Sequence, residues 1–246
     1  MQLKIYQNHF ALSLSAANEI IEHVTMKPAS VLCLAAGDTP KLAYELMAKK
    51  AAEEKIDFSK CTFIALDEWL GIPPDNEGSC CYFLQKNIFE PLQIAASQIH
   101  LFNALAENTD EECKKMDTII FDKGGIDLIL AGVGMNGHIG FNEPGVALDK
   151  YSHVISLDAT TQSAGQKYFN RRTDLQKGIT LGFHHILRAR KLLLMASGIK
   201  KAAIMQKAIE EEINNQIPAS MVRTHADSLV MIDNEAASLL QRTTNI

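Results

Sequence analysis

Residues 126–145, Ile-Asp-Leu-Ile-Leu-Ala-Gly-Val-Gly-Met-Asn-Gly-His-Ile-Gly-Phe-Asn-Glu-Pro-Gly, join a predicted buried strand to a polar loop. Residues 127–131 form a nearly continuous apolar run, which is typical of a strand that a parallel sheet buries on both faces. The glycines that follow allow a sharp turn and a close approach of the backbone to a ligand. The loop then presents Asn136, His138, Asn142 and Glu143. An imidazole with a carboxylate to orient it can transfer protons near neutral pH, so the loop is a candidate catalytic site.

Residues 132–137 of this stretch also satisfy the G-x-G-x-x-G pattern that binds a dinucleotide pyrophosphate. That pattern functions where its third glycine opens a helix whose amino terminus faces the phosphate. Here Gly140, Pro144 and Gly145 follow too closely for a helix to begin. We therefore favour a reactive loop over a dinucleotide site. The third interpretation is a purely structural turn from strand to loop.

The composition describes a single α/β domain covering residues 1–246. The chain is 47% hydrophobic and 22% charged, with a net charge of -5. It has no basic run, which argues against a nucleic-acid partner, although a local cationic pocket is compatible with this charge. The amino terminus shows no signal-peptide pattern, and no stretch approaches the ~20 apolar residues of a membrane span. We expect no membrane partner and a cytoplasmic location.

The five cysteines indicate a reducing compartment, because their number is odd and none forms a C-x-x-C pair. The same spacing argues against a zinc site, and most of the thiols are expected to be packing residues. His184 and His185 are adjacent, and neighbouring side chains diverge, so they make a poor pair of metal ligands. We expect no metal and no other cofactor.

Short β-rich runs alternate with longer helical patterns along the chain, which predicts a Rossmann-like, doubly wound, mostly parallel sheet flanked by helices. Strands are expected at residues 3–6 on a sheet edge, 31–35, 62–66, 127–131, 154–157, 179–182, 192–196 and 229–232. Helices are expected at residues 11–23, 40–55, 80–89, 110–123, 160–169, 200–210 and 235–242.

Ligands of such sheets bind beyond the carboxyl ends of the strands, and residues 32–40 form one of these ends. A tight glycine turn leads into a helix with Thr39 as the expected N-cap and Pro40 at the first helical position. Free amides at the helix start make a natural phosphate site, and the alternative is an ordinary capped helix. Asp38 argues against a phosphate, because its carboxylate repels an anion unless it points away.

A second strand end, residues 63–69, finishes in the two carboxylates of Asp67 and Glu68. Successive strand side chains point to opposite faces, so at most one carboxylate is expected to enter a pocket while the other caps or pairs locally. One carboxylate is thus available as a base. The alternative is a solvated strand end with no chemical role.

Four motifs give the chain a family resemblance that covers nearly its whole length. They are Ala-Gly-Asp-Thr-Pro at 36–40, Leu-Asp-Glu-Trp-Leu-Gly at 66–71, Gly-Met-Asn-Gly-His-Ile-Gly-Phe-Asn-Glu-Pro-Gly at 134–145, and Gly-Ile-Lys-Lys-Ala at 198–202. The chain resembles the glucosamine-6-phosphate deaminase/isomerase family, which shares its fold with the 6-phosphogluconolactonases. The Asn-Glu-Pro after the Gly-His favours the deaminase branch, because lactonases lack the glutamate five residues after the histidine.

The resemblance implies a reaction and a role for each residue. The substrate would be a 2-amino-2-deoxyhexose 6-phosphate, which opens its ring, moves a proton from C2 to C1 and loses ammonia to give a ketohexose 6-phosphate. His138, held by Glu143 and Asn136, would open the ring, and Asp67 would carry the proton between the two carbons. The remaining residues implied to bind substrate, most of them at the phosphate, are Ala36, Gly37, Asp38, Thr39, Gly132, Gly137, Lys167, which aligns with a family arginine, and Lys201.

Two other functions remain as alternatives, a 6-phosphogluconolactonase-type hydrolase and a non-catalytic sugar-phosphate-sensing domain. The sensing domain is disfavoured because the chain shows no DNA-binding extension and retains His138, Glu143 and Asp67 together. His153 stands where family members often carry an arginine associated with allosteric control, so regulation by an acetylated sugar phosphate is not expected. The sequence leaves open the configuration at C4 of the sugar and whether the protein is a monomer or a homo-oligomer.

Overall fold

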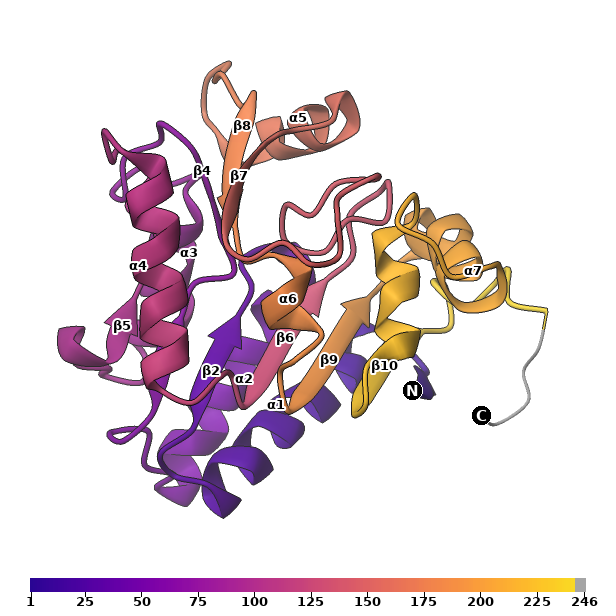
Figure 1. Cartoon of the computed structure of the whole chain (residues 1–246). Coiled ribbons are helices and arrows are strands. Elements are labelled where there is room, and N and C mark those ends of the chain that lie inside the picture. Colours follow the sequence, from indigo (N-terminus) through magenta and orange to yellow (C-terminus); the bar gives the residue numbers. More distant parts are fainter. Residues whose placement is uncertain (242–246) are drawn as a thin grey trace.

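The computed structural model describes residues 1–241 and is built around a seven-stranded sheet (Figure 1). All neighbouring strands in this sheet are parallel. Their order is β1 (Gln2–Tyr6), β10 (Ser228–Asp233), β9 (Lys191–Ala196), β6 (Leu128–Gly132), β2 (Val31–Leu34), β3 (Thr62–Ile64) and β5 (Ile99–His100). The predicted doubly wound, mostly parallel sheet is confirmed, with β1 on an edge as expected.

Helices cover both faces of this sheet because its strands are apolar on both sides. On β2, Leu32 and Leu34 pack toward α1 (His9–Met26) and α2 (Asp38–Glu54). The intervening Cys33 packs in the opposite layer. That layer contains α4 (Thr109–Asp122), α6 (Phe183–Ile186) and α7 (Ala202–Glu210) (Figure 1). The period of two along buried strands thus separates two hydrophobic layers.

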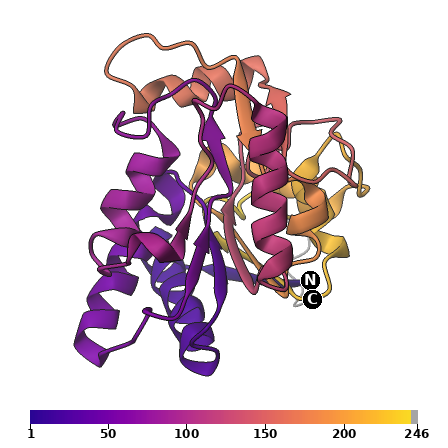
Figure 2. The same cartoon turned by 60° about the vertical axis from the view of Figure 1, so that its left-hand side comes forward.

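A second, antiparallel sheet stands above the carboxyl ends of the parallel strands and consists of β4 (Asp67–Trp69), β8 (Lys177–Thr180) and β7 (His153–Ser156) (Figure 2). Placing the predicted strands 154–157 and 179–182 in the parallel sheet was therefore wrong. Their apolar patterns located the strands to within two residues, but β8 pairs with β4 and β7 instead. Trp69, Phe141 and Leu175 form a separate small core beneath this sheet.

Other elements differ from the predictions at their ends. The predicted helix 80–89 is α3 (Cys80–Leu84) continued by a π-helix, η1 (Gln85–Phe89), and the predicted helix 160–169 is α5 (Ala159–Gly165) followed by the 3₁₀ turn η3 (Gln166–Tyr168). Further 3₁₀ turns are η2 (Ala96–Gln98), η4 (Ile199–Lys201) and η5 (Pro218–Thr224).

The prediction of a helix at residues 235–242 was wrong for residues 235–241, which the structure describes. Residues 234–239 form consecutive turns, and residue 242 lies outside the described residues. The Asp233 carboxylate accepts hydrogen bonds from the amides of Ala236 and Gly198, which ties this segment to the loop after β9. A segment this short forms a stable helix only when tertiary packing supports it.

The chain reverses its winding direction between β2 and β6, which places the topological switch point of the sheet there. From β2 the strands proceed through β3 to β5, whereas from β6 they proceed through β9 to β10. The loops after β2 and β6 therefore diverge and leave a crevice. Within residues 1–241, no helix is both long and apolar enough to cross a membrane, and no group of three or more His, Cys, Asp or Glu side chains is arranged to hold a metal.

Candidate active site

A cavity of about 400 Å³ lies at the switch point, between the two sheets. The loops after β2, β6 and β9 form its floor, and β4 with α5 and η3 form its opposite wall. Nine of the twelve residues predicted to form the site line this cavity: Ala36, Gly37, Asp38, Thr39, Asp67, Gly132, His138, Lys167 and Lys201. Asn136 and Glu143 lie behind His138. Gly137 faces Ile204 and Ile217 instead of the cavity.

The loop after β2 presents the start of α2 to the cavity. Helix α2 begins at Asp38 with Gly37 as its N-cap, so the prediction of Thr39 as N-cap was wrong. Gly37 has a φ of 123°, a conformation that only glycine adopts without strain, and this earlier turn starts the helix two residues sooner than predicted. The first amides of α2 have no partner within the helix, which suits them to an anion.

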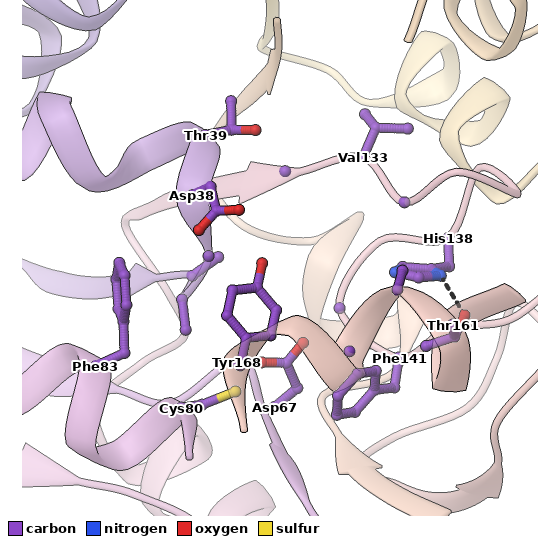
Figure 3. A pocket seen from close by; sticks show the side chains of 18 of the residues that line it. Asp38, Thr39, Asp67, Cys80, Phe83, Val133, His138, Phe141, Thr161 and Tyr168 are labelled. Carbon is purple, nitrogen blue, oxygen red and sulfur yellow. Dashed lines mark hydrogen bonds between the residues drawn. The ribbon is translucent and has the colours of Figure 1, made fainter. Parts of the chain in front are cut away.

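Asp38 points toward η3 and pairs with Lys167, whose Nζ lies 2.6 Å from the carboxylate. Although burial lowers the pKa of Lys167, the hydrogen bond from Lys167 to Asp38 raises it overall. The Tyr168 hydroxyl points toward this loop (Figure 3) and would lie 3.7 Å from a Cβ atom added to Gly37. The negative charge in this loop is thus compensated from the opposite wall, which answers the objection that Asp38 would repel an anion.

Lys201 reaches the cavity from η4, where its ammonium donates to the carbonyl of Val133 over 2.5 Å. Burial and the nearby charge of Lys167 lower its pKa to about 8. An anion between the two lysines would stabilise the charged form of Lys201. These lysines and the start of α2 therefore form the cationic end of the cavity.

Asp67, the first residue of β4, enters the cavity, while Glu68 points away from it. Burial, with a contribution from the charge of Glu68, raises the pKa of Asp67 to about 7. Glu68 accepts hydrogen bonds from the amides of Cys80 and Cys81 at the start of α3, over 2.9 and 2.7 Å. The prediction that only one carboxylate enters a pocket and the other caps locally is confirmed. Asp67 has the properties of a general base that works near neutral pH.

His138 lies against Gly134, where a Cβ atom would overlap its imidazole. The ring nitrogen Nδ1 is 3.0 Å from the Thr161 hydroxyl and 3.5 Å from Glu143 Oε2. The other ring nitrogen points toward the middle of the cavity (Figure 3). Because Nδ1 has oxygen partners, Nε2 is the nitrogen that is free to exchange a proton with a ligand.

Asn136 and Glu143 support this imidazole from behind. Asn136 donates to Glu143 over 2.7 Å, and its own side-chain oxygen accepts the His138 amide over 3.2 Å. Burial would raise the pKa of Glu143, but the interactions with His138, Thr161 and Asn136 lower it overall. Glu143 is thus an anion next to the imidazole ring. Asn136 holds the Glu143 carboxylate in this direction without adding charge.

The lining residues that were not predicted include three polar side chains near the predicted ones: Thr161, Tyr168 and Cys80. Thr161 and Tyr168 fall in a segment that was predicted only as a helix, and Cys80 was expected to be a packing residue. No local signal identifies Thr161, because its partner His138 is 23 residues away along the chain. Tyr168 could have been found from the sequence, because it directly follows Lys167, a residue already proposed to bind the phosphate.

Sequence comparison gives a family match and close relatives. The family model of glucosamine-6-phosphate isomerases/6-phosphogluconolactonase matches residues 8–231. A glucosamine-6-phosphate deaminase of Clostridium perfringens (strain 13 / Type A) is 40% identical over 242 residues, which are 98% of this chain and 100% of the relative. A glucosamine-6-phosphate deaminase of Thermoanaerobacter pseudethanolicus is 36% identical and covers 98% of this chain and 95% of its own.

Comparison with solved structures finds both a glucosamine-6-phosphate deaminase and 6-phosphogluconolactonases. A monomeric glucosamine-6-phosphate deaminase superposes with a TM-score of 0.94 and 33% identity, covering 97% of this chain and all of the other. The 6-phosphogluconolactonase of Trypanosoma brucei superposes with a TM-score of 0.74 and 18% identity, covering 96% of this chain and 97% of its own. The second likeness shows a shared fold.

Proposed function

Because this chain belongs to the family of glucosamine-6-phosphate isomerases and 6-phosphogluconolactonases, we propose that it is a glucosamine-6-phosphate deaminase-type enzyme. It converts a 2-amino-2-deoxyhexose 6-phosphate to a ketohexose 6-phosphate and ammonia, within one domain and without a cofactor. The observation that carries this proposal is the placement of a carboxylate whose pKa is raised to about 7, Asp67, in the same cavity as an imidazole backed by an anion. Two proton-transfer groups beside a cationic end match the needs of this reaction.

Ring opening is the task of His138. Its Nε2 takes the proton of the C1 hydroxyl and returns a proton to the ring oxygen, so the pyranose becomes the open-chain aldehyde. The imidazolium formed in between is stabilised by Glu143, which lies 3.5 Å from Nδ1. Thr161 and Asn136 hold these two groups in position.

Asp67 then moves the proton between the carbons. Its carboxylate removes the C2 proton while the substrate's own C2 ammonium gives a proton to the C1 oxygen, which yields a planar enolamine, and the acid form of Asp67 then delivers its proton to C1 on the same face. The ketimine left at C2 is hydrolysed by water, and ammonia leaves. A base with a pKa near 7 is well matched, because a large fraction of it is ionised at neutral pH and it is still basic enough to take a proton.

The 6-phosphate occupies the cationic end of the cavity. It accepts hydrogen bonds from the first amides of α2 and from Lys201, while Lys167, which stays paired with Asp38, adds positive charge nearby. The Tyr168 hydroxyl, which points toward the start of α2, adds a further donor at this end of the cavity. This arrangement leaves C1 and C2 of the sugar on the side of Asp67 and His138.

Removal of the Lys201 charge tests this assignment. Lys201→Met is expected to raise KM by roughly ten- to a hundred-fold with little change in kcat, because a charge-assisted contact to the phosphate contributes about 1.5 to 3 kcal/mol. The wild-type KM should also rise above about pH 8, where Lys201 loses its proton, and this rise should be absent from the variant. Lys207→Met, which removes an exposed lysine of α7 outside the cavity, is the control and should leave KM unchanged. An equal KM in Lys201→Met and Lys207→Met would mean that the phosphate binds at another place in the cavity.

A 6-phosphogluconolactonase activity is the second candidate, favoured only by the shared fold. Incubation with glucosamine-6-phosphate, galactosamine-6-phosphate and 6-phosphogluconolactone separates the possibilities, with ammonia measured for the first two and lactone opening for the third. We expect ammonia release from at least one amino sugar and background lactone opening. Lactone opening without ammonia would overturn the proposal, and a protein that binds the sugars without turnover would be a sensing domain.

We place this enzyme in the cytoplasm, with a small sugar phosphate as its partner. All five cysteines are free thiols, which suits a reducing compartment. Both a monomer and a homo-oligomer are compatible with this assignment, although the superposed deaminase is monomeric.

A further inference from the structure

The loop after β9, which carries Lys201 into the cationic end of the cavity, is held from the neighbouring strand by Asp233. Asp233 is the last residue of β10, which lies beside β9 in the parallel sheet (Figure 1). Its carboxylate accepts hydrogen bonds from the Ser197 hydroxyl, from the Gly198 amide over 3.1 Å and from the Ala236 amide over 2.8 Å. Only 4% of its surface is exposed, so these donors within the protein take the place of water around the charge.

Gly198 explains why this loop needs a partner on another strand. It is the N-cap of η4 and has a φ of 91°, a conformation in which a side chain would be strained, so it offers no side chain to bond the first amides of the turn. Asp233 supplies this cap from β10 instead. The Gly198 carbonyl accepts the Lys201 amide over 2.9 Å, so a single turn of backbone separates the anchor from the lysine.

The position of this turn decides where the Lys201 ammonium lies. Its Nζ donates to the Val133 carbonyl in the loop after β6, which places the charge at the cavity floor opposite the start of α2. A displaced turn would break this contact and move the ammonium away from the first amides of α2, although the charge itself would remain.

We propose that Asp233 is a positioning residue for the cationic end of the cavity, which acts by fixing the η4 turn so that Lys201 meets the phosphate. This inference rests on the phosphate site of the proposed function. It goes further in assigning a role to a carboxylate that does not line the cavity. The competing role is a general stabiliser of the fold, which would lower the melting temperature without changing the phosphate affinity of the folded protein.

The proposed role needs a hydrogen-bond acceptor and not a negative charge, because a carboxylate near a phosphate repels it. Asp233→Asn keeps an oxygen for the two amides, and its NH₂ group can donate to the Ser197 hydroxyl, so it should preserve the anchor. Asp233→Ala removes all three bonds. Asp233→Ser, whose shorter side chain cannot reach three donors, serves in its place if the alanine protein does not fold.

The test measures kcat, KM and the affinity for inorganic phosphate, the last by a ³¹P NMR titration that needs no turnover. Complete loss of a charge-assisted phosphate contact costs roughly ten- to a hundred-fold, and a misplaced lysine keeps part of it, so Asp233→Ala should weaken phosphate binding and raise KM about five- to tenfold. The kcat should stay nearly unchanged, and Asp233→Asn should resemble the wild type in all three quantities.

Asp127 provides a matched control at the opposite edge of the sheet. It is also a buried aspartate that accepts a backbone amide, that of Val31 over 2.8 Å, but it lies at the amino end of β6, away from the cavity. Asp127→Ser should lower the melting temperature and leave the phosphate affinity unchanged.

A double variant shows whether Asp233 acts through Lys201. Substitutions that remove the same interaction are not additive, so Asp233→Ala should not weaken phosphate binding further in the Lys201→Met protein. Four outcomes would each overturn the proposal: an additional loss in the double variant, an unchanged phosphate affinity in the variant that lacks the anchor, equal losses in Asp233→Asn and Asp233→Ala, or an equal loss in the Asp127 control.

The phosphate titration also separates this inference from the proposed function. If no amino sugar phosphate is deaminated but phosphate binding still depends on Asp233 through Lys201, the proposed reaction is wrong and the anchor stands. If turnover is normal but the variant without the anchor binds phosphate like the wild type, the reaction stands and the role of Asp233 is wrong.

Discussion

The Asp67→Asn enzyme is expected to bind substrate with nearly the wild-type affinity and to lose at least 10²-fold in kcat, the usual contribution of a positioned general base. An amide has nearly the same shape as the carboxylate but cannot accept the C2 proton. Exchange of solvent deuterium into the substrate should disappear together with ammonia release. In the wild type, kcat/KM should fall as the pH drops below about 7, because Asp67 becomes protonated there.

The measurement is ammonia release and deuterium incorporation over this pH range, for the wild type and Asp67→Asn. A variant that keeps more than about a tenth of the wild-type kcat would remove Asp67 from the mechanism. Loss of ammonia release with full deuterium exchange would assign it to a later step instead.

The His138→Asn enzyme is expected to lose about 10²- to 10⁴-fold in kcat/KM, because asparagine cannot exchange a proton with the ring oxygen of the cyclic sugar as the imidazole is proposed to do. The loss should lie in ring opening alone, since Asp67 and the phosphate site are untouched. Asparagine was chosen because it fits the space beside Gly134 and can still bond to Thr161.

Enzyme concentration distinguishes this role from a general loss of activity. If the variant consumes only the spontaneously opened sugar, the rate should stop increasing at high enzyme concentration and reach the uncatalysed rate of ring opening. Wild-type enzyme should show no such plateau. A variant rate that stays proportional to enzyme concentration above that limit would transfer ring opening to another residue.

Six of the seven strands of the parallel sheet could be predicted because they are apolar runs bounded by helical patterns, a local property of the chain, whereas the two-residue strand β5 was missed. The small sheet could not, because β4 begins only three residues after β3 ends, with no glycine or proline between them to mark the change of sheet. Its partner β8 lies more than a hundred residues further along the chain. Strand pairing over such distances is set by tertiary packing and leaves no local pattern.

For the candidate site, too, local features could be predicted from the sequence and long-range contacts could not. Residues on one loop, such as His138 and Glu143, could be grouped from their spacing. Contacts between distant segments could not, and the ion pair of Asp38 with Lys167 joins residues 129 positions apart. The sequence therefore showed the charge of Asp38 without its compensating partner.

The burial of Asp67 also has a thermodynamic consequence for the whole molecule. An aspartate in the unfolded chain ionises near pH 4, whereas in the folded protein the pKa of Asp67 is about 7. Between these values the folded state holds a proton that the unfolded state has released, so the stabilisation linked to this proton is complete below about pH 4 and is lost as the pH rises to 7. Above pH 7 the protein carries a desolvated charge that opposes folding. The catalytically dead Asp67→Asn protein should therefore melt at a higher temperature than the wild type at pH 8, with the difference vanishing near pH 4.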